Sequence, residues 1–225
     1  MSLYPVNLAI NGQLCLVIGG GSVATRKVAS LLSCGAAVRV ISPQAKKRIG
    51  ELAEAGLLEW QQRKYRHGDL QGAKLVFAAT DDHEIQDRII SEANASGILV
   101  NVVTRPEACS FQVPAALRQG ELLITVSTGG GSPAMATRIK QELELIYGPE
   151  YGRFVALMSE LRKEVVPSGG VQAEHKRIFE RVLNADVFTF IRKQEWGELE
   201  ALLRNILPST LNVSSLVECA RKEVS

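Results

Sequence analysis

Residues 19–24 have the types and spacing of a loop that binds the phosphates of a dinucleotide. Gly19, Gly21 and Ala24 come directly after the apolar run at 14–18 and directly before a helical pattern, as in the fingerprint G-x-G-x-x-A. In that fingerprint the first glycine permits a tight turn, the second lets the backbone approach the pyrophosphate, and the small third residue lets helix and strand pack closely. We expect the pyrophosphate to lie on the helix N-terminus. The residues expected to bind this cofactor here are Gly19, Gly21, Ser22, Val23 and Ala24.

The pattern around this turn predicts alternating strands and helices. Apolar residues recur with helical spacing from Ala24 to Leu32, Gly35 is expected to stop this helix, and residues 38–41 follow as a second strand. Strand, helix and strand then form a β-α-β unit with parallel strands. Further on, the sequence predicts helices at 44–55 and around 85–93, and strands at 58–62, 75–79 and 99–103. This alternation indicates an α/β protein with a Rossmann-like doubly wound parallel sheet.

Three further loops are candidate site loops, because ligands of such sheets lie beyond the carboxyl ends of the strands. The residues concerned are Ser42, Pro43 and Gln44, then Thr80 and Asp81, and finally Thr104 and Arg105. Thr80 and Asp81 could contact the cofactor, but aspartate also suits a helix cap, and we expect one of Asp81 and Asp82 to have that role. We interpret His83 as a surface residue at the start of a helix.

The choice between NAD and NADP stays open in the sequence. An acidic residue that would bind both ribose hydroxyls of NAD is absent after the second strand, which ends in Ile41, Ser42 and Pro43. The basic run 46–48 follows closely, and it fits either the 2'-phosphate of NADP or a solvated helix face.

The pattern changes beyond Pro114. We predict a short helix at 115–118, a strand at 122–127, and a long helix that begins at Pro133 and ends near Gly148. Only helical periodicity follows, with breaks at 167–170 and 208–209. The expected domains are a nucleotide-binding domain at 1–113, a dimerisation segment with a glycine-rich substrate loop at 114–148, and a helical domain at 149–225.

The loop at 127–133 is a second candidate anion site. Ser127 and Thr128 supply hydroxyl groups, the three glycines that follow expose N–H groups, and Pro133 suits the first helical turn. Arg138 adds positive charge further along the helix. The alternative is a flexible connector, since loops of serine and glycine are common where nothing binds.

Composition excludes several other classes of protein. The 225 residues are 46% hydrophobic and 22% charged, and 26 basic against 24 acidic residues give a net charge of +2, too balanced to predict nucleic acid as a partner. The N-terminus lacks the pattern of a signal peptide and no apolar run is long enough to span a membrane, so we expect a cytoplasmic protein that does not bind membranes. The four scattered cysteines lack metal-ligand spacing and are expected to be reduced; we expect no metal site.

Taken together, these motifs resemble the precorrin-2 dehydrogenase and sirohydrochlorin ferrochelatase family, which includes the N-terminal module of siroheme synthase. The resemblance covers most of the chain, and it is specific because the motifs occur in the same order and spacing. The residues that carry it are 15–24 with Arg26 and Lys27, 78–82, 101–103, Ser110 and Phe111, Val113 and Pro114, 126–130, and Ser132 and Pro133.

The resemblance implies that the protein removes a hydride and a proton from precorrin-2, a reduced tetrapyrrole rich in carboxylates, and releases sirohydrochlorin, with NAD as acceptor. Some members of the family also insert Fe2+. It further implies a homodimer formed through residues 114–148, with the tetrapyrrole between the nucleotide domain and the helical part. The residues expected to bind substrate are Arg105, Ser127, Thr128, Gly129, Gly130, Ser132 and Arg138.

The chain departs from this family at one position. The family has an aspartate, regarded as the acid–base residue of both activities, where this sequence has Thr104. A threonine hydroxyl is a poor general base near neutral pH, so the proton would pass to water or to a neighbour such as Glu107 or His83. We expect the dehydrogenase activity to survive better than iron insertion. Two alternatives stay open: an enzyme that is bifunctional or mainly inserts Fe2+ into sirohydrochlorin, and a noncatalytic sensor of tetrapyrrole or nucleotide.

Overall fold

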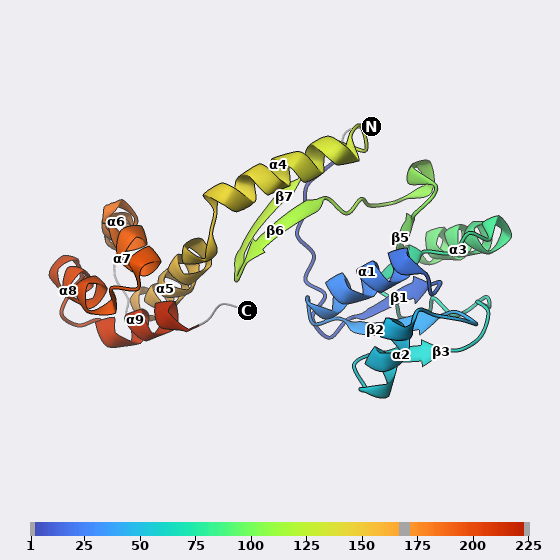
Figure 1. Ribbon diagram of the computed structural model, residues 1–225, viewed down its shortest axis with the longest axis horizontal. Helices are drawn as coiled ribbons and strands as arrows, with labels where there is room; N and C mark the ends of the chain where they lie inside the picture. Colours follow the sequence, from blue (N-terminus) through green and yellow to red (C-terminus); the bar gives the residue numbers. More distant parts are fainter. Residues whose placement is uncertain (1–2, 167–171, 223–225) are drawn as a thin grey trace. The chain divides into compact units, whose positions relative to one another are not determined.

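The computed structural model describes residues 3–166 and 172–222, and the chain divides into two compact units, residues 1–113 and 114–225 (Figure 1). The breaks expected at 167–170 lie outside the described residues. The four cysteines are free thiols. Among the described residues, no helix is both long and apolar enough to cross a bilayer.

The first unit is built on a five-stranded parallel sheet with the strand order β3-β2-β1-β4-β5. Its strands are β1 (Leu14–Ile18), β2 (Ala37–Ile41), β3 (Glu59–Gln61), β4 (Leu75–Ala78) and β5 (Leu99–Val102). The helices are α1 (Ser22–Leu32), α2 (Lys47–Glu54), α3 (His83–Ser96) and the 3-10 turn η1 (Pro106–Ala108). The predicted Rossmann-like doubly wound sheet is thus confirmed.

Both faces of this sheet are buried, which explains why the neighbouring strands β1 and β4 are apolar at every position. Cys15 and Val17 of β1 pack in one core with α1 and α2, whereas Leu16 and Ile18 pack in the other with α3. All four side chains are almost completely inaccessible to solvent. Because burial of each large apolar side chain contributes about 1.5–3 kcal/mol, these strands hold the loops at their carboxyl ends in place.

The second unit begins with an antiparallel hairpin, and the helix predicted at 115–118 is wrong. Residues 115–118 belong to β6 (Ala115–Gln119), which pairs with β7 (Leu122–Val126). Alanine, leucine and arginine favour helix locally, but Gly120 has a φ of +55° that closes a tight turn, and Leu117 is buried opposite Ile124. Cross-strand pairing therefore overrides local propensity here.

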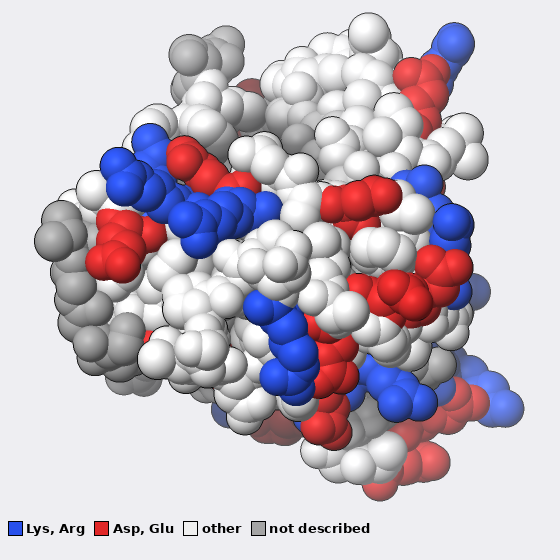
Figure 2. Space-filling view, turned by 90° about the vertical axis from the view of Figure 1, so that its left-hand side faces the viewer, with Lys and Arg blue, Asp and Glu red and all other residues white. Residues whose placement is uncertain are grey.

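In the described residues after the hairpin, the second unit contains helices and no further strands, as the periodicity predicts. Its helices are α4 (Pro133–Ile146), α5 (Pro149–Val165), α6 (Gln172–Asn184), α7 (Val187–Lys193), α8 (Trp196–Ile206) and α9 (Val213–Arg221). Helix α4 packs on the β6–β7 hairpin, while α5 and α7–α9 share a core with α6 around Leu157, Leu161 and Leu203. On the face shown in Figure 2, basic and acidic side chains lie next to one another, with no large area of one sign.

Candidate functional site

The glycine turn after β1 is held in place by backbone contacts that only glycine allows. Gly19 has a φ of +123°, and a Cβ built there would lie 2.2 Å from the carbonyl oxygen of Ala79. Gly20 is equally restricted, since its Cβ would lie 2.1 Å from the carbonyl oxygen of Gln44, and its own carbonyl accepts a hydrogen bond from the Lys46 N–H at 2.8 Å. The turn is therefore clamped between the loops that follow β4 and β2. The fingerprint assigned no role to Gly20.

The N-terminus of α1 is arranged to receive an anion. Gly21 is the N-cap residue and offers no side chain, and the first turn of the helix contains no acidic residue. Gly21 and Ser22 are exposed, Val23 is half-buried, and Ala24 is fully buried against the sheet. A Cβ on Gly21 would meet no atom within 4 Å in the protein itself. Backbone N–H groups at a helix N-terminus attract phosphate groups, so the space beside Gly21 suits a pyrophosphate.

A pocket of about 170 Å³ lies where the strand order reverses, between β1 and β4. Four of the predicted cofactor residues line it, namely Gly19, Ser42, Pro43 and Thr80. The other lining residues are Ile18, Ile41, Lys64, Tyr65, Asp82 and Ile85. Gly21, Ser22, Val23, Ala24, Gln44 and Asp81 lie outside this lining, although each is adjacent in the chain to a loop that contributes to it or is part of the α1 N-terminus. In open α/β sheets this crevice is the place where ligands bind.

The loop after β2 uses its polar groups internally. The Ser42 hydroxyl donates to the Gln44 carbonyl at 2.6 Å, and the Trp60 indole N–H donates to the Ser42 carbonyl at 3.1 Å. Further on, Lys47 and Arg48 form ion pairs with Glu51, at 3.6 Å and 3.3 Å respectively. These two basic side chains therefore have partners along their own helix.

The loops after β4 and β5 are joined by one buried side chain that the sequence did not indicate. The amide nitrogen of Gln86 donates to the Thr80 carbonyl at 2.6 Å and to the Thr104 hydroxyl at 3.0 Å, and Gln86 is fully inaccessible to solvent. Asp82 is the capping aspartate, since its carboxylate accepts from the Ile85 N–H. Gln86 thus links Thr104 to the edge of the nucleotide pocket.

Three residues of the first unit were expected to accept the proton or to bind a substrate carboxylate, namely His83, Glu107 and Arg105. Each is exposed or already has a partner. His83 is the exposed first residue of α3. Arg105 forms ion pairs with Asp87 and with Glu107, the latter at 3.6 Å, and these carboxylates raise the pKa of its guanidinium further. Because such surface pairs are weak, Arg105 can exchange these carboxylates for another.

The second glycine loop is ordered by its own hydroxyl groups. The Ser127 and Thr128 hydroxyl oxygens accept from the backbone N–H groups of Gly129 and Ser132, at 3.2 Å and 3.0 Å. The Ser132 hydroxyl caps α4 by accepting from the Met135 N–H. Gly129 and Gly130 have φ values of +61° and +87°. The loop is therefore a built turn that leads into a capped helix.

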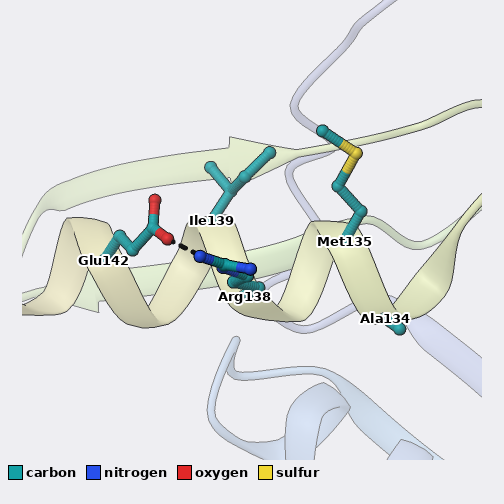
Figure 3. Close-up of a pocket in the computed structure, with 5 residues that line it drawn as sticks. All are labelled: Ala134, Met135, Arg138, Ile139 and Glu142. Atoms are coloured by element: carbon teal, nitrogen blue, oxygen red, sulfur yellow. Dashed lines mark hydrogen bonds and ion pairs between the residues drawn. The ribbon is translucent and has the colours of Figure 1, made fainter.

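Helix α4 presents a hollow beside this loop, about 460 Å³ in volume. Figure 3 shows its lining, in which Arg138 donates to Glu142 at 3.0 Å while Met135 and Ile139 supply apolar surface. Of the predicted substrate residues, the structure brings Ser127, Thr128, Gly129, Gly130, Ser132 and Arg138 together on one loop and helix, whereas Arg105 belongs to the first unit.

Sequence reasoning also missed the segment between β3 and β4. Lys64 and Tyr65 from this segment line the nucleotide pocket, and Glu92 of α3 anchors it. The buried carboxylate of Glu92 accepts from the Tyr65 hydroxyl and from the backbone N–H groups of Gly68 and Leu70, and it pairs with His67 at 2.9 Å. Burial opposes ionisation of Glu92, but these hydrogen bonds and the His67 charge outweigh it and lower its pKa. The spacing of these residues carries no motif, so only the fold reveals the cluster.

We expect this cluster to make the first unit sensitive to acid. A carboxyl whose pKa is lower in the folded state stabilises that state above its unfolded pKa, about 4.3 for glutamate, and the stabilisation is lost as the pH falls through the folded pKa. Glu92→Gln should therefore reduce the free energy of unfolding by about 2 kcal/mol at pH 7, and the difference from the parent should shrink below about pH 4.5.

The measurement is chemical unfolding at several pH values between 7 and 3, followed by Trp60 fluorescence, with the parent and the variant both carrying Trp196→Phe so that Trp60 is the only tryptophan. Leu31→Ala is the control because it removes a buried apolar side chain that does not titrate. Its difference from the parent should be the same at every pH. A Glu92→Gln difference that is equally constant would contradict the assignment of acid sensitivity to Glu92.

Within residues 3–166 and 172–222, no group of three or more His, Cys, Asp or Glu side chains is arranged to hold a metal ion.

The fold and the pocket define a Rossmann-type dinucleotide-binding protein, with the glycine turn at the switch point of a parallel sheet. Residues 6–115 match the family model described as Putative NAD(P)-binding. The first unit therefore contains an NAD(P)-binding domain.

Over most of its length the chain is homologous to siroheme synthases, which confirms the predicted resemblance. It is 36% identical to the siroheme synthase of Nitrosococcus oceani over 90% of this chain and 44% of that protein. It is 37% identical to the siroheme synthase of Chromobacterium violaceum over 81% of this chain and 39% of that protein. The chain thus spans less than half the length of these relatives.

Among solved structures, the chain is similar to SirC, precorrin-2 dehydrogenase. The TM-score is 0.73 at 26% sequence identity, and the match covers 91% of this chain and 98% of SirC. Unlike the siroheme synthases, SirC is matched over nearly its whole length.

Proposed function

We propose that this protein oxidises precorrin-2 to sirohydrochlorin, with NAD+ as the hydride acceptor. The observation that carries the proposal is the glycine turn at the switch point of an NAD(P)-binding sheet, in a chain that matches SirC over 98% of that protein. In this reaction the substrate loses a hydride to the nicotinamide and a proton to a base or to water. Hydride transfer depends mainly on the placement of the cofactor, for which the first unit is equipped.

The roles of the residues follow from their positions. The N–H groups at the start of α1 bind the pyrophosphate, and the closely packed Gly19 and Gly20 keep this helix end beside the pocket. Thr80, on the β4 side of the switch point, lies toward the nicotinamide half, and Gln86 fixes its position relative to Thr104. The Thr104 hydroxyl orients substrate or water rather than acting as the base.

We favour NAD+ over NADP+ as part of this proposal. The basic run was the main argument for a 2'-phosphate, but none of its residues lines the nucleotide pocket, and Lys47 and Arg48 pair with Glu51 on their own helix. This arrangement supports the solvated-face interpretation of the run. A preference for NADP+ in direct titrations would overturn this part of the proposal alone.

The second unit is proposed to bind substrate and a second copy of the chain. The Arg138 guanidinium suits the carboxylates of a tetrapyrrole, and so do the N–H groups of Thr128 and Gly130, which the hydrogen bonds within the 127–132 loop do not use. For the homodimer, the support is the apolar surface of α4: Met135, Leu145 and Ile146 are 57%, 88% and 57% exposed, and among residues 133–146 only Ala136 is buried. Such surface is typical of an interface.

The direct test of the activity is anaerobic incubation of the full chain with precorrin-2 and NAD+. We expect absorbance of the reduced cofactor and of sirohydrochlorin to appear together, in equal amounts. The control omits precorrin-2. Absence of cofactor reduction with both NAD+ and NADP+ would refute the proposed activity.

The dimer is tested separately by light scattering with Leu145→Glu. A charge buried in an apolar interface costs several kcal/mol, so the variant should be a monomer at micromolar concentration where the parent is a dimer. Glu144→Gln, next to it in the sequence, is the control and should leave the parent's mass unchanged. A parent that is itself a monomer would contradict the dimer proposal.

A further inference from the structure

The segment formed by residues 63–70 is one wall of the nucleotide pocket, and buried contacts fix it to α3. Lys64 and Tyr65 line the pocket together with Ser42 and Pro43 from the end of β2. In a Rossmann sheet the end of β2 lies beside the adenosine ribose of a bound dinucleotide. The segment therefore faces the adenosine half of the cofactor.

Two carboxylates, those of Asp69 and Glu92, hold the segment in its conformation by hydrogen bonds. Within it, Arg63 donates to both carboxylate oxygens of Asp69 at 2.7 Å, and the Arg66 N–H donates to the same carboxylate. The second carboxylate that holds the segment is that of Glu92, which lies on α3 and is 7% exposed. The donors to Glu92, the Tyr65 hydroxyl and the N–H groups of Gly68 and Leu70, all come from this one segment.

Glu92 acts on the pocket through Tyr65. The Tyr65 side chain is 4% exposed, its hydroxyl is held by Glu92, and the Arg88 guanidinium lies 5.6 Å from the centre of its ring. Two residues of α3, Glu92 and Arg88, thus fix the position of Tyr65, which itself lines the pocket. A buried carboxylate is costly unless fully paired, and here every pairing group serves to hold the segment against the helix.

We propose that Glu92 is a positioning residue for the cofactor: through Tyr65 it holds the 63–70 segment as the wall against which the adenosine half of the dinucleotide binds. This inference rests on the proposed dinucleotide-dependent function and adds to it a residue that does not touch the cofactor. Glu92 would then both position the cofactor and stabilise the fold, and the two roles can be distinguished. Loss of the wall weakens binding of any ligand that contains adenosine diphosphate, whereas a lower free energy of unfolding alone does not.

The test uses the full chain with Trp196→Phe as background, so that Trp60 is the only tryptophan. Trp60 reports on the pocket because its indole donates to the carbonyl of Ser42, which lines the pocket. NAD+ and ADP-ribose, which lacks the nicotinamide, are titrated separately at a temperature well below the melting point of every variant. The variants are Glu92→Gln and Tyr65→Phe, and Leu31→Ala is the control, buried near the end of α1 that is far from the glycine turn.

Glu92→Gln should raise the dissociation constants of NAD+ and ADP-ribose by the same factor, about tenfold, because a glutamine amide leaves buried N–H donors unpaired. Tyr65→Phe should raise both dissociation constants about threefold. In steady-state assays the KM for NAD+ should rise while kcat at saturating NAD+ stays within about twofold. Leu31→Ala should lose thermal stability and keep both dissociation constants within about twofold of the background.

Unchanged dissociation constants for both ligands in Glu92→Gln would overturn the inference while leaving the proposed function intact. If Glu92→Gln does not fold, Tyr65→Phe decides, and unchanged affinity in that variant overturns the inference. Weakened binding in Leu31→Ala equal to that in Glu92→Gln would also overturn it, because stability alone would then account for the effect. A background protein that binds neither NAD+ nor NADP+ would refute the proposed function itself.

Discussion

Gly19→Ala should unfold or strongly destabilise the nucleotide-binding unit, whereas Gly21→Ala, at the N-cap of α1, should lower its stability by less than about 1 kcal/mol and still weaken cofactor binding. At Gly19 a Cβ would lie 2.2 Å from one backbone oxygen and 2.7 Å from the carbon that bears it, in a conformation with positive φ. Neither atom can move without moving β4, so the expected loss is about 3 kcal/mol or more. At Gly21 the added Cβ meets no protein atom, and it interferes only when a pyrophosphate occupies that space.

The two glycine variants are compared by thermal unfolding and by titration with NAD+. For Gly21→Ala we expect a melting temperature close to that of the parent and a dissociation constant raised at least about tenfold, equivalent to about 1.4 kcal/mol. Gly72→Ala is a control for positive φ without contacts, since its φ is +79° and no atom lies near its Cβ. The interpretation of the turn fails if Gly21→Ala binds NAD+ as tightly as the parent.

Thr104→Asp should increase iron insertion far more than it increases oxidation of precorrin-2. Thr104 is exposed, and the buried amide of Gln86 already points a donor at its hydroxyl, so a carboxylate there would be oriented in the same way. Insertion of Fe2+ requires removal of pyrrole protons, and a positioned general base contributes about 10²–10⁴-fold to such a step. We expect the rate of siroheme formation to rise about 10²-fold and the dehydrogenase rate by less than about tenfold.

The matched control for the base is Thr104→Asn, which has nearly the shape of aspartate without its charge. Both variants are assayed with sirohydrochlorin and Fe2+ against the spontaneous rate, and with precorrin-2 and NAD+. Equal rates in the two variants would show that charge at position 104 does not matter. A parent without dehydrogenase activity that gains it in Thr104→Asp would instead favour the noncatalytic sensor.

The loop that carries Thr104, where the family has an aspartate, is held by contacts that need no carboxylate at this position. Thr104, Arg105 and Glu107 all follow β5, and each has a partner within the first unit: Gln86 holds the threonine, while Arg105 pairs with Asp87 and Glu107. The loop is therefore ordered without an acid–base residue at position 104. The glycine turn after β1 and Thr104 after β5 lie on separate loops, so a change at one need not disturb the other.

Much of the nucleotide site was predictable because its signals are local. The glycine turn, the apolar strands and the cap at Asp82 each depend on residues within about four positions of one another in the chain. The error at 115–118 has the opposite origin. Its residues favour helix by themselves, and only pairing with residues 122–126 makes them a strand.

The sequence by itself determined the class of this protein, since the order of strand, glycine turn and helix specifies a parallel sheet with a phosphate-binding helix end. Tertiary structure alone decided which distant side chains complete the site. Gln86 reaches Thr104 across 18 residues, and Glu92 reaches Tyr65 across 27. Such contacts leave no periodic trace, because a buried hydrogen bond requires two groups to meet in space, at any separation along the chain.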